Sequence, residues 1–486
     1  MSVRALFGKL RLLPTPFFAP IFRQGPQPPD KPSHIKTFQF TKRMTEASFD
    51  EIKATALAAL ANDEKDIAFQ TLRSALEYGT ATMTGDTETF ADAMTVFTRI
   101  AQQFGNNEFA TKVENVAKEP EDVQCLCDLG YALYEESLFG VGAGVLARAD
   151  RLAPGQPGIV SELVCALESA GFNQEAVGIL KGYSNLTVEH YLFAYLLAFN
   201  SLMAGDLASA RTAAESLEGL ETEDAHPFMS ARIAALLNRA KKIETVCSLD
   251  GRDLRGWHYV TSGSILTTLS PHGYPEPMSG RYAYLQDTME NCKNGLLQLK
   301  EIISHKGLKP ECIYALPGRD SGILAIAASK LLDLPVQPWP EQGSDRPGVI
   351  VAYDLGEVEL NPETIAQHRS GQLLYSHAVQ WTRALPIAPD VTTLLHQMLI
   401  APWGSRTGFD AETQQITTSD ADTRDATTIA ADLVSTPIEE PEFTSADEAP
   451  PVLSEAFLDA IGEFPQSSSA REQIWTCSPV KSSKFN

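Results

Sequence analysis

Hydrophobic positions between residue 48 and about residue 245 follow the spacing of amphipathic helices, and no alternating pattern there predicts a strand. Ser48 and Glu51 form a capping box at the start of this region, in which each side chain can bind a backbone N–H group that the first helical turn leaves unpaired. Short Gly, Asn and Asp turns, such as those at 105–107 and 205–206, interrupt the pattern. The sequence therefore predicts an all-helical N-terminal half.

Residue types within this helical region recur with a period of 34. Two antiparallel helices approach closely only where side chains are small, so Ala and Gly are expected at the crossing points. A Gly directly after a helix also suits a left-handed turn. Between residues 123 and 220 the matching positions are Leu129, Leu163 and Leu197, then Gly171 and Gly205, then Ala176 and Ala210.

This pattern resembles the tetratricopeptide repeat, in which large residues of one helix meet small residues of the next. The resemblance implies that residues 48–245 form a stack of helical hairpins, because a single hairpin cannot cover its own apolar face. It also implies a groove that binds a protein or peptide partner. A generic helical bundle with Ala-rich interfaces is the alternative.

Short apolar runs alternate with helical patterns from residue 250 to residue 404, which predicts a small α/β domain with a mainly parallel sheet. Together with the N-terminal half, this gives a multidomain α plus α/β protein with disordered termini. We expect extended segments at 257–260 and 265–269, strands at 312–316, 349–353 and 373–381, and helices at 282–305, at 321–332, from 361 onward and at 390–401.

The most informative stretch of this domain runs from a buried strand through a Gly-containing loop directly into an Ala-rich helix that ends in Leu-Asp-Leu-Pro. A helix N-terminus offers unpaired N–H groups and suits an anion. An acidic residue also follows the strand at 349–353. A plain structural turn is the alternative interpretation. The candidate ligand-binding residues are Gly318, Arg319, Asp320, Ser321, Gly322 and Asp354.

Residues 310–382 resemble the core of type I phosphoribosyltransferases, in which such a loop lies on the pyrophosphate side. In that comparison Asp354 would hold ribose hydroxyls or a metal ion. The Thr- and Gly-rich turn that cradles the sugar phosphate is missing here. The resemblance therefore implies a degenerate domain that binds a nucleotide or a protein, or that only packs. Mg²⁺ is expected only if the domain is an active enzyme.

The chain has 62 acidic and 39 basic residues, a net charge of −23, which argues against nucleic acids and anionic membranes as partners. No apolar run approaches the ~18 residues that a membrane helix needs. Seven cysteines show no metal-ligand spacing and suggest reduced thiols in a cytoplasmic compartment. We find no nucleophile elbow and no phosphate loop, and so assign no catalytic residue and no metal site.

Both ends of the chain differ from the middle. Residues 1–47 are basic and rich in Pro, which fits a disordered leader, a true start at Met44, or an organelle-targeting segment. Residues 405–486 are acidic and are expected to be disordered. One apolar island in this tail has helical spacing and would dock in a groove, for instance in the repeats, or is a chance cluster: Phe457, Leu458, Ile461 and Phe464.

These features favour an adaptor or scaffold that binds partners through helical repeats, with an α/β domain of binding or structural role. Such a protein needs no cofactor. The alternative is an enzyme of the phosphoribosyltransferase class that acts on a phosphorylated sugar or nucleotide and is recruited through the repeats. An assembly factor for a larger complex would have the same repeats.

Overall fold

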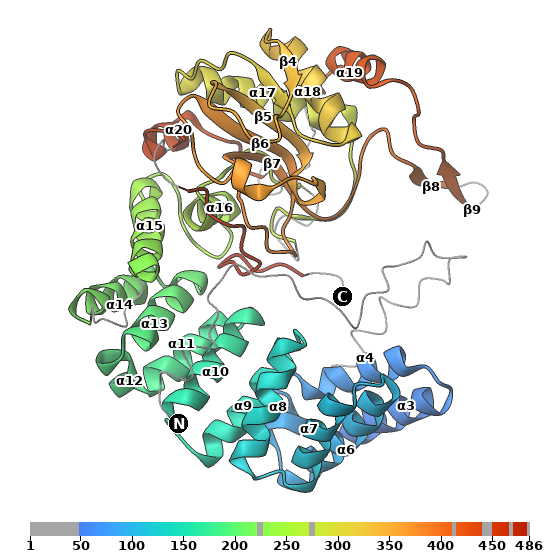
Figure 1. Ribbon diagram of the computed structural model, residues 1–486, viewed down its shortest axis with the longest axis vertical. Helices are drawn as coiled ribbons and strands as arrows, with labels where there is room; N and C mark the ends of the chain where they lie inside the picture. The colour runs from blue at the N-terminus through green and yellow to red at the C-terminus, as the bar shows by residue number, and fades with distance from the viewer. Residues whose placement is uncertain are drawn as a thin grey trace. The chain divides into compact units, whose positions relative to one another are not determined.

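The computed structural model describes residues 48–220, 227–271, 278–410, 415–439, 450–465 and 470–483 (Figure 1). The chain forms two compact units. The first, here called the repeat unit, extends to Ser201 and includes Ala208–Ala225. The second, the sheet unit, comprises Leu202–Leu207 and the chain from His226 onward. The predicted basic leader lies outside the described residues.

Residues 48–220 contain helices and no strand, as predicted. Each long helix packs mainly against its neighbours in the sequence, for example α8 against α9 and α9 against α10. The helices are α3 (Phe49–Ala61), α4 (Lys65–Leu76), α5 (Ala81–Thr84), α6 (Thr87–Gln103), α7 (Asn107–Lys118), α8 (Val123–Glu135), α9 (Phe139–Leu152), α10 (Pro157–Ser169), α11 (Asn173–Gly182), α12 (Ser184–Glu189), α13 (Tyr191–Met203) and α14 (Leu207–Gly219).

The structure confirms the helical repeat. The turns after α8, α10 and α13 contain Ser137, Gly171 and Gly205, which are spaced by 34 residues and have φ angles of 61°, 81° and 81°. A positive φ favours Gly, so the sequence period marks the same turn in three successive units. The capping box also forms, with Ser48 N donating to Glu51 Oε2 at 2.9 Å.

Small residues lie where the helices cross. A Cβ atom added to Gly130 of α8 would lie 2.5 Å from Leu146 Cγ of α9. Ala176 and Ala210, one period apart, are both fully buried, as are Leu129 and Leu163. These contacts explain why the large and small residues keep their register from one unit to the next.

The sheet unit contains a sheet whose strands are all parallel, in the order β1-β7-β6-β5-β3-β4, with β2 also paired to β7. A separate antiparallel pair consists of β8 and β9. The strands are β1 (Ile265–Leu266), β2 (Tyr282–Gln286), β3 (Ile313–Ala315), β4 (Val336–Pro338), β5 (Gly348–Asp354), β6 (Gln372–Gln380), β7 (Val391–Ile400), β8 (Arg406–Asp410) and β9 (Gln415–Ser419).

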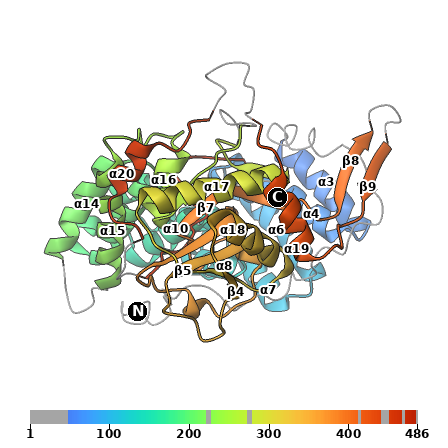
Figure 2. The same ribbon diagram turned by 90° about the horizontal axis from the view of Figure 1, so that it is seen from above.

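Helices and loops cover opposite faces of this sheet (Figures 1 and 2). On the helical face, α17 contacts β6, and α18 contacts β3 and β5. On the other face, here called the loop face, residues of β3, β5 and β6 pack against Ile365, Ile387 and neighbouring loop residues. The helices of the unit are α15 (Pro227–Ile243), α16 (Leu254–Ser262), α17 (Met289–His305), α18 (Arg319–Leu332), α19 (Ala426–Ser435) and α20 (Glu455–Ile461), with 3-10 turns η1 (Leu355–Glu357) and η2 (Pro362–Thr364).

Three element predictions in this unit are wrong, and a fourth is correct only in part. Residues 257–260 belong to helix α16, because Asp253 caps its first turn and Gly263 ends it with a φ of 73°. The helix expected over 282–305 forms only over Met289–His305, as α17, whereas residues 282–286 form strand β2. The helix expected from residue 361 is only the turn η2. The segment 391–400 is strand β7, whose buried Val-Thr-Thr-Leu-Leu start lies between β6 and β1, while β2 pairs with its second half.

The tail is more ordered than expected. The described residues after 405 include the β8–β9 hairpin, α19 and α20. The apolar island forms α20, and its Phe457 ring meets Tyr259 edge to face at a centroid distance of 5.7 Å. This helix packs against α15, which lies within the range predicted for the repeats, and against α17; both belong to the sheet unit. No helix of the described residues has the length and apolar character that would let it cross a membrane.

Candidate functional site

The parallel strands of the sheet unit end at one edge, and most of the predicted ligand-binding residues lie there. From β3 the chain passes through Gly318 into α18 and on to β4, then returns to β5 on the other side of β3. Such a switch point at the carboxyl ends of strands is where open α/β sheets usually bind ligands. Gly318 is exposed and has a φ of 106°, which permits the sharp turn.

Other parts of the same chain occupy the polar groups of this loop. The Arg319 guanidinium donates to the carbonyl oxygens of Asp422 and Arg424. Asp320 accepts a hydrogen bond of 2.6 Å from Trp403 Nε1. Backbone contacts complete the turn: Ser321 Oγ accepts from Tyr353 N, and Gly322 N donates to Gly318 O. The polar side chains of the loop are thus hydrogen-bonded to other residues of the same chain.

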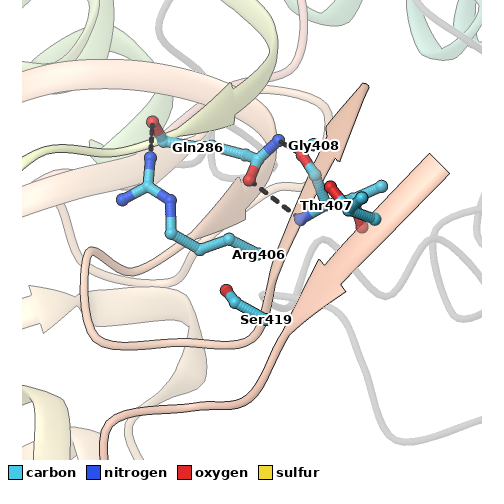
Figure 3. A pocket seen from close by; sticks show the side chains of 6 residues that line it. Gln286, Arg406, Thr407, Gly408 and Ser419 are labelled. Atoms are coloured by element: carbon cyan, nitrogen blue, oxygen red, sulfur yellow. Dashed lines mark hydrogen bonds between the residues drawn. The ribbon is translucent and has the colours of Figure 1, made fainter. Parts of the chain in front are cut away.

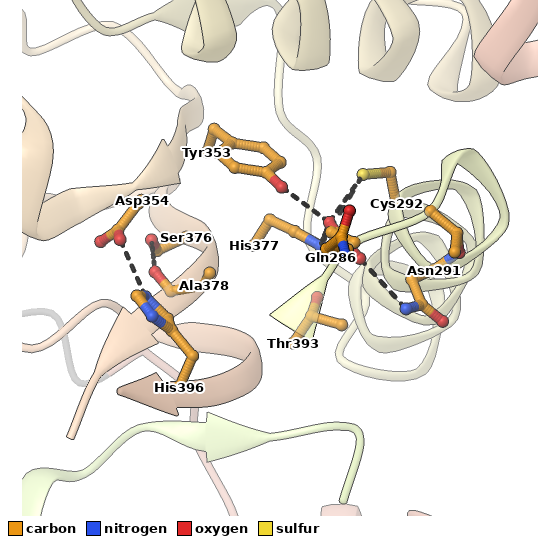
Figure 4. Close-up of polar contacts among 12 residues, drawn as sticks. Gln286, Asn291, Cys292, Tyr353, Asp354, Ser376, His377, Ala378, Thr393 and His396 are labelled. Carbon is orange, nitrogen blue, oxygen red and sulfur yellow. Dashed lines mark hydrogen bonds and ion pairs between the residues drawn. The ribbon is translucent and has the colours of Figure 1, made fainter. Parts of the chain in front are cut away.

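Asp354 ends β5 at the same edge, but its carboxylate lies on the loop face. Its Oδ2 atom is 2.8 Å from His396 Nε2, and its Oδ1 atom accepts from Gly356 N at 2.9 Å (Figure 4). Ser321 contacts the backbone of the residue before Asp354, so the loop and the end of β5 are adjacent. The structure therefore brings the predicted residues to one edge but gives Asp354 a histidine partner.

His396 is a residue that the sequence reasoning missed. It lies on β7, 42 residues after Asp354, and the segment was expected to be a helix. Its Nδ1 atom is buried and has no hydrogen-bond partner in the described part of the chain. A correct strand assignment for 391–400 would have placed His396 in the sheet, but its position on the face of Asp354 follows from the register of β5, β6 and β7.

A second polar cluster lies on the helical face, beneath the same edge. Asp287, just after β2, accepts hydrogen bonds from Tyr353 Oη at 2.7 Å and from Cys292 Sγ at 3.3 Å. His377 Nε2 lies 2.9 Å from the same oxygen, Asp287 Oδ2, and Asn291 Nδ2 donates to Asp287 Oδ1 at 3.0 Å. Figure 4 shows the side chains of Tyr353, Cys292 and His377 converging from separate elements.

Burial and hydrogen bonding have opposite effects on the pKa of the Asp287 carboxyl group in this cluster. Burial alone would raise the pKa of Asp287, but His377, Tyr353 and Asn291 stabilise the carboxylate and bring its pKa below the usual value. Burial raises the pKa of Cys292 well above that of a free thiol, and the Asp287 charge adds to this effect. Burial likewise raises the pKa of the Tyr353 hydroxyl. Asp287 is thus the charged centre, surrounded by donors.

The sheet unit also has a small polar pocket beside the β8–β9 hairpin (Figure 3). Its volume is about 340 Å³. The walls are tied together, because Gln286 Nε2 donates to Thr407 O at 2.6 Å and Arg406 donates to the carbonyls of Gln286 and Asp287. The pocket shares no residue with the predicted loop. Its lining residues are Gln286, Arg406, Thr407, Gly408, Thr417 and Ser419.

The repeat unit presents an exposed acidic stripe on α8. The side of α8 opposite Leu126, Leu129 and Leu133 carries exposed side chains with helical spacing. Here this set is called the α8 stripe. Burial and the nearby Glu135 charge raise the pKa of Glu162 on α10, so Glu162 lies close enough to Glu135 for their carboxyl groups to interact. The α8 stripe consists of Gln124, Asp128, Tyr131 and Glu135.

No family model and no curated protein matches this chain. Among solved structures, the crystal structure of a tetratricopeptide-repeat protein from Thermus thermophilus matches with 17% identity and a TM-score of 0.22. The match covers 38% of this chain and 97% of that one. A TM-score of 0.22 is too low to support a conclusion about the fold. The class of this chain, a helical-repeat protein with a parallel α/β unit, follows from the arrangement of its own helices and strands.

Proposed function

We propose that this chain is a protein-interaction adaptor or scaffold that binds a peptide or a partner protein through its helical repeats. The observation that carries the proposal is the α8 stripe, an exposed surface on a helix whose opposite side is fixed in the stack. Tyr131 is 40% exposed there, and exposed aromatic residues often contribute strongly to protein interfaces. The sheet unit has a binding or structural role in this proposal.

The charge of the stripe narrows the class of partner. Asp128 and Glu135 are exposed on either side of Tyr131, and Glu162 adds a third carboxyl group nearby. Complementary charge increases association rates and selects against partners of like sign. We therefore propose a partner segment that carries Lys or Arg residues next to an apolar or aromatic side chain.

The test uses the full-length protein and a photo-crosslinker at position 131. Lysate of the source cells is irradiated, and the captured proteins are identified by mass spectrometry and then confirmed as purified components. The double variant Asp128→Lys, Tyr131→Ala should bind a confirmed partner at least about tenfold more weakly, since it removes both the charge and the aromatic contact. The matched control Glu108→Lys reverses an exposed charge on α7, outside the stripe, and should leave binding unchanged.

Equal binding by the double variant and the wild type would contradict this location of the interface. The same set of captured proteins with the crosslinker at position 131 and at position 108 would also contradict an interface on the α8 stripe. If no captured protein binds as a purified component, the adaptor proposal itself loses its support.

The exposed Gly318 loop at the switch point favours a second candidate function. In this alternative, the sheet unit binds a phosphorylated sugar or nucleotide with Mg²⁺, as the resemblance to phosphoribosyltransferases implies. Phosphoribosyl pyrophosphate with Mg²⁺ should then raise the unfolding midpoint of the full-length protein by mass action. Asp354→Asn should abolish turnover, whereas an adaptor would keep its partners. An unchanged midpoint at millimolar ligand would contradict the alternative.

A further inference from the structure

The buried cluster around Asp287 combines three side chains of metal-binding type from three different elements. Asp287 follows β2, Cys292 lies in the first turns of α17, and His377 lies on β6. All three are buried, and their ligand atoms lie within 4.8 Å of one another. Their spacing in the sequence matches no metal-binding motif, so this convergence is visible only in the fold.

The distances between the three ligand atoms are close to those around a tetrahedral metal ion. Bond lengths of about 2.0–2.3 Å place the N, O and S ligands of tetrahedral zinc about 3.2–3.6 Å apart. In the cluster, Cys292 Sγ lies 3.3 Å from Asp287 Oδ2 and 3.8 Å from His377 Nε2. The remaining edge, from Asp287 Oδ2 to His377 Nε2, is 2.9 Å. Shifts of a few tenths of an ångström would therefore accommodate an ion.

The donor set and its charge specify the kind of ion. A thiolate, an imidazole and a carboxylate form a mixed S, N and O set, which suits Zn²⁺ better than Mg²⁺ or Ca²⁺. The thiolate and the carboxylate together would neutralise a divalent cation, so the buried site would carry no net charge. Tyr353 Oη, 2.7 Å from Asp287 Oδ2, is placed to complete the fourth position, and Asn291 orients the carboxylate.

We propose that Asp287, Cys292 and His377 bind a structural Zn²⁺ ion. The ion would join the end of β2 to α17 and to β6, and so fix α17 on the helical face of the sheet. A structural zinc ion contributes directly to folding, because the unfolded chain does not hold the ligands together. This inference does not depend on the proposed adaptor function.

The first experiment measures metal in the wild-type full-length protein. Protein purified without chelators should contain close to one equivalent of zinc by elemental mass spectrometry. After removal of the zinc and addition of Co²⁺, a thiolate-to-cobalt charge-transfer band should appear in the near ultraviolet, together with the intense visible bands of tetrahedral Co²⁺. Zinc-free protein that binds neither Zn²⁺ nor Co²⁺ would overturn the proposal without any variant.

Two variants locate the metal within the fold. Cys292→Ser should bind Zn²⁺ at least about 100-fold more weakly and should lose the charge-transfer band. Cys312→Ser is the matched control, because Cys312 is also a buried thiol, but it contacts Pro347 O and Gln337 instead of a metal-binding side chain. Equal zinc content and equal cobalt spectra in the two variants would exclude Cys292 as a ligand and overturn the proposal.

A conservative change at the proposed fourth position provides a further test that leaves Asp287, Cys292 and His377 intact. Tyr353→Phe removes the hydroxyl that contacts Asp287 and should weaken zinc binding about 10- to 100-fold while the charge-transfer band remains. A Tyr353→Phe variant with unchanged affinity would remove Tyr353 from the proposed site. Loss of the band in this variant would contradict the assignment of Cys292 as the sulfur ligand.

Discussion

The two units of this chain are stabilised by contacts of different range. In the repeat unit, a helix packs mainly against the next helix in the sequence, and the same small and large positions return after 34 residues. In the sheet unit, neighbouring strands such as β1 and β7 are distant in the sequence, and buried ion pairs join other distant segments. The carboxylate of Asp390 and the guanidinium of Arg471, for example, are separated by 81 residues. Contacts between successive helices thus stabilise the repeat unit, whereas the sheet unit also depends on polar contacts between segments that are distant in the sequence.

The largest effect is expected where the sheet unit depends on one such contact. Arg471 donates to both oxygens of Asp390 and to the carbonyls of Ile365 and Gln367, and the side chains of the ion pair are almost fully buried. Arg471→Met would leave the buried carboxylate without its main counter-charge, which costs about 3–5 kcal/mol. Urea unfolding followed by the near-ultraviolet signal of the sheet-unit tryptophans would measure this loss.

The control for this variant is Arg424→Met. Arg424 also pairs with carboxylates, those of Asp422 and Asp432, but its side chain is half exposed. An exposed pair contributes only about 0–1 kcal/mol, so the control should unfold almost like the wild type. Similar losses of unfolding free energy in the two variants would show that a buried ion pair between distant segments stabilises the unit no more than an exposed local pair does.

The same ion pair makes the stability of the sheet unit depend on pH. Burial by itself would raise the pKa of Asp390, but Arg471 and His368 lower it from 3.8 to about 2. Because the folded-state pKa is depressed, this stabilisation is present above the unfolded-state pKa near 4 and is lost as the pH falls toward 2. A shift of this size corresponds to about 2 kcal/mol.

A difference measurement isolates this contribution from other acidic groups. The gap in unfolding free energy between the wild type and Asp390→Asn should shrink by about 2 kcal/mol between pH 5 and pH 2. Unfolding in urea at closely spaced pH values would give the curve. A gap that stays constant, or one that widens at low pH, would contradict the depressed pKa of Asp390.

The contrast between the units also explains how much of the fold the sequence could predict. The helical half was predicted because its signals are local: the capping box at Ser48, the turn glycines and the 34-residue period all act within one or two helices. The sheet was predicted as mainly parallel, but β7 was mistaken for a helix. Asp390 resembles a helix cap in the sequence, and only the fold shows that it instead meets Arg471.

The candidate site shows the same limit. The sequence could place Gly318 at a strand–helix junction and Asp354 at the end of a strand, because both follow from neighbouring residues. The sequence could not predict that Asp354 contacts His396 or that Cys292 lies beside His377, since those contacts depend on strand order and register. Arg319 also meets carbonyl groups more than 100 residues away, and no local pattern predicts that contact.

The smallest expected effects come from a pair of glycines that test packing within the repeat unit. Gly130→Ala adds a methyl group 2.5 Å from Leu146 Cγ, so α8 and α9 must move apart, at a cost of about 1–2 kcal/mol. Gly178→Ala adds the same group on α11, where no atom lies within 4 Å, and should stabilise the helix by about 0.5–1 kcal/mol. Urea unfolding followed by helical circular dichroism would measure both. If both variants change stability in the same direction, close approach at Gly130 does not limit the packing of α8 against α9. Opposite signs would show that the contact with Leu146 outweighs helix propensity at this position.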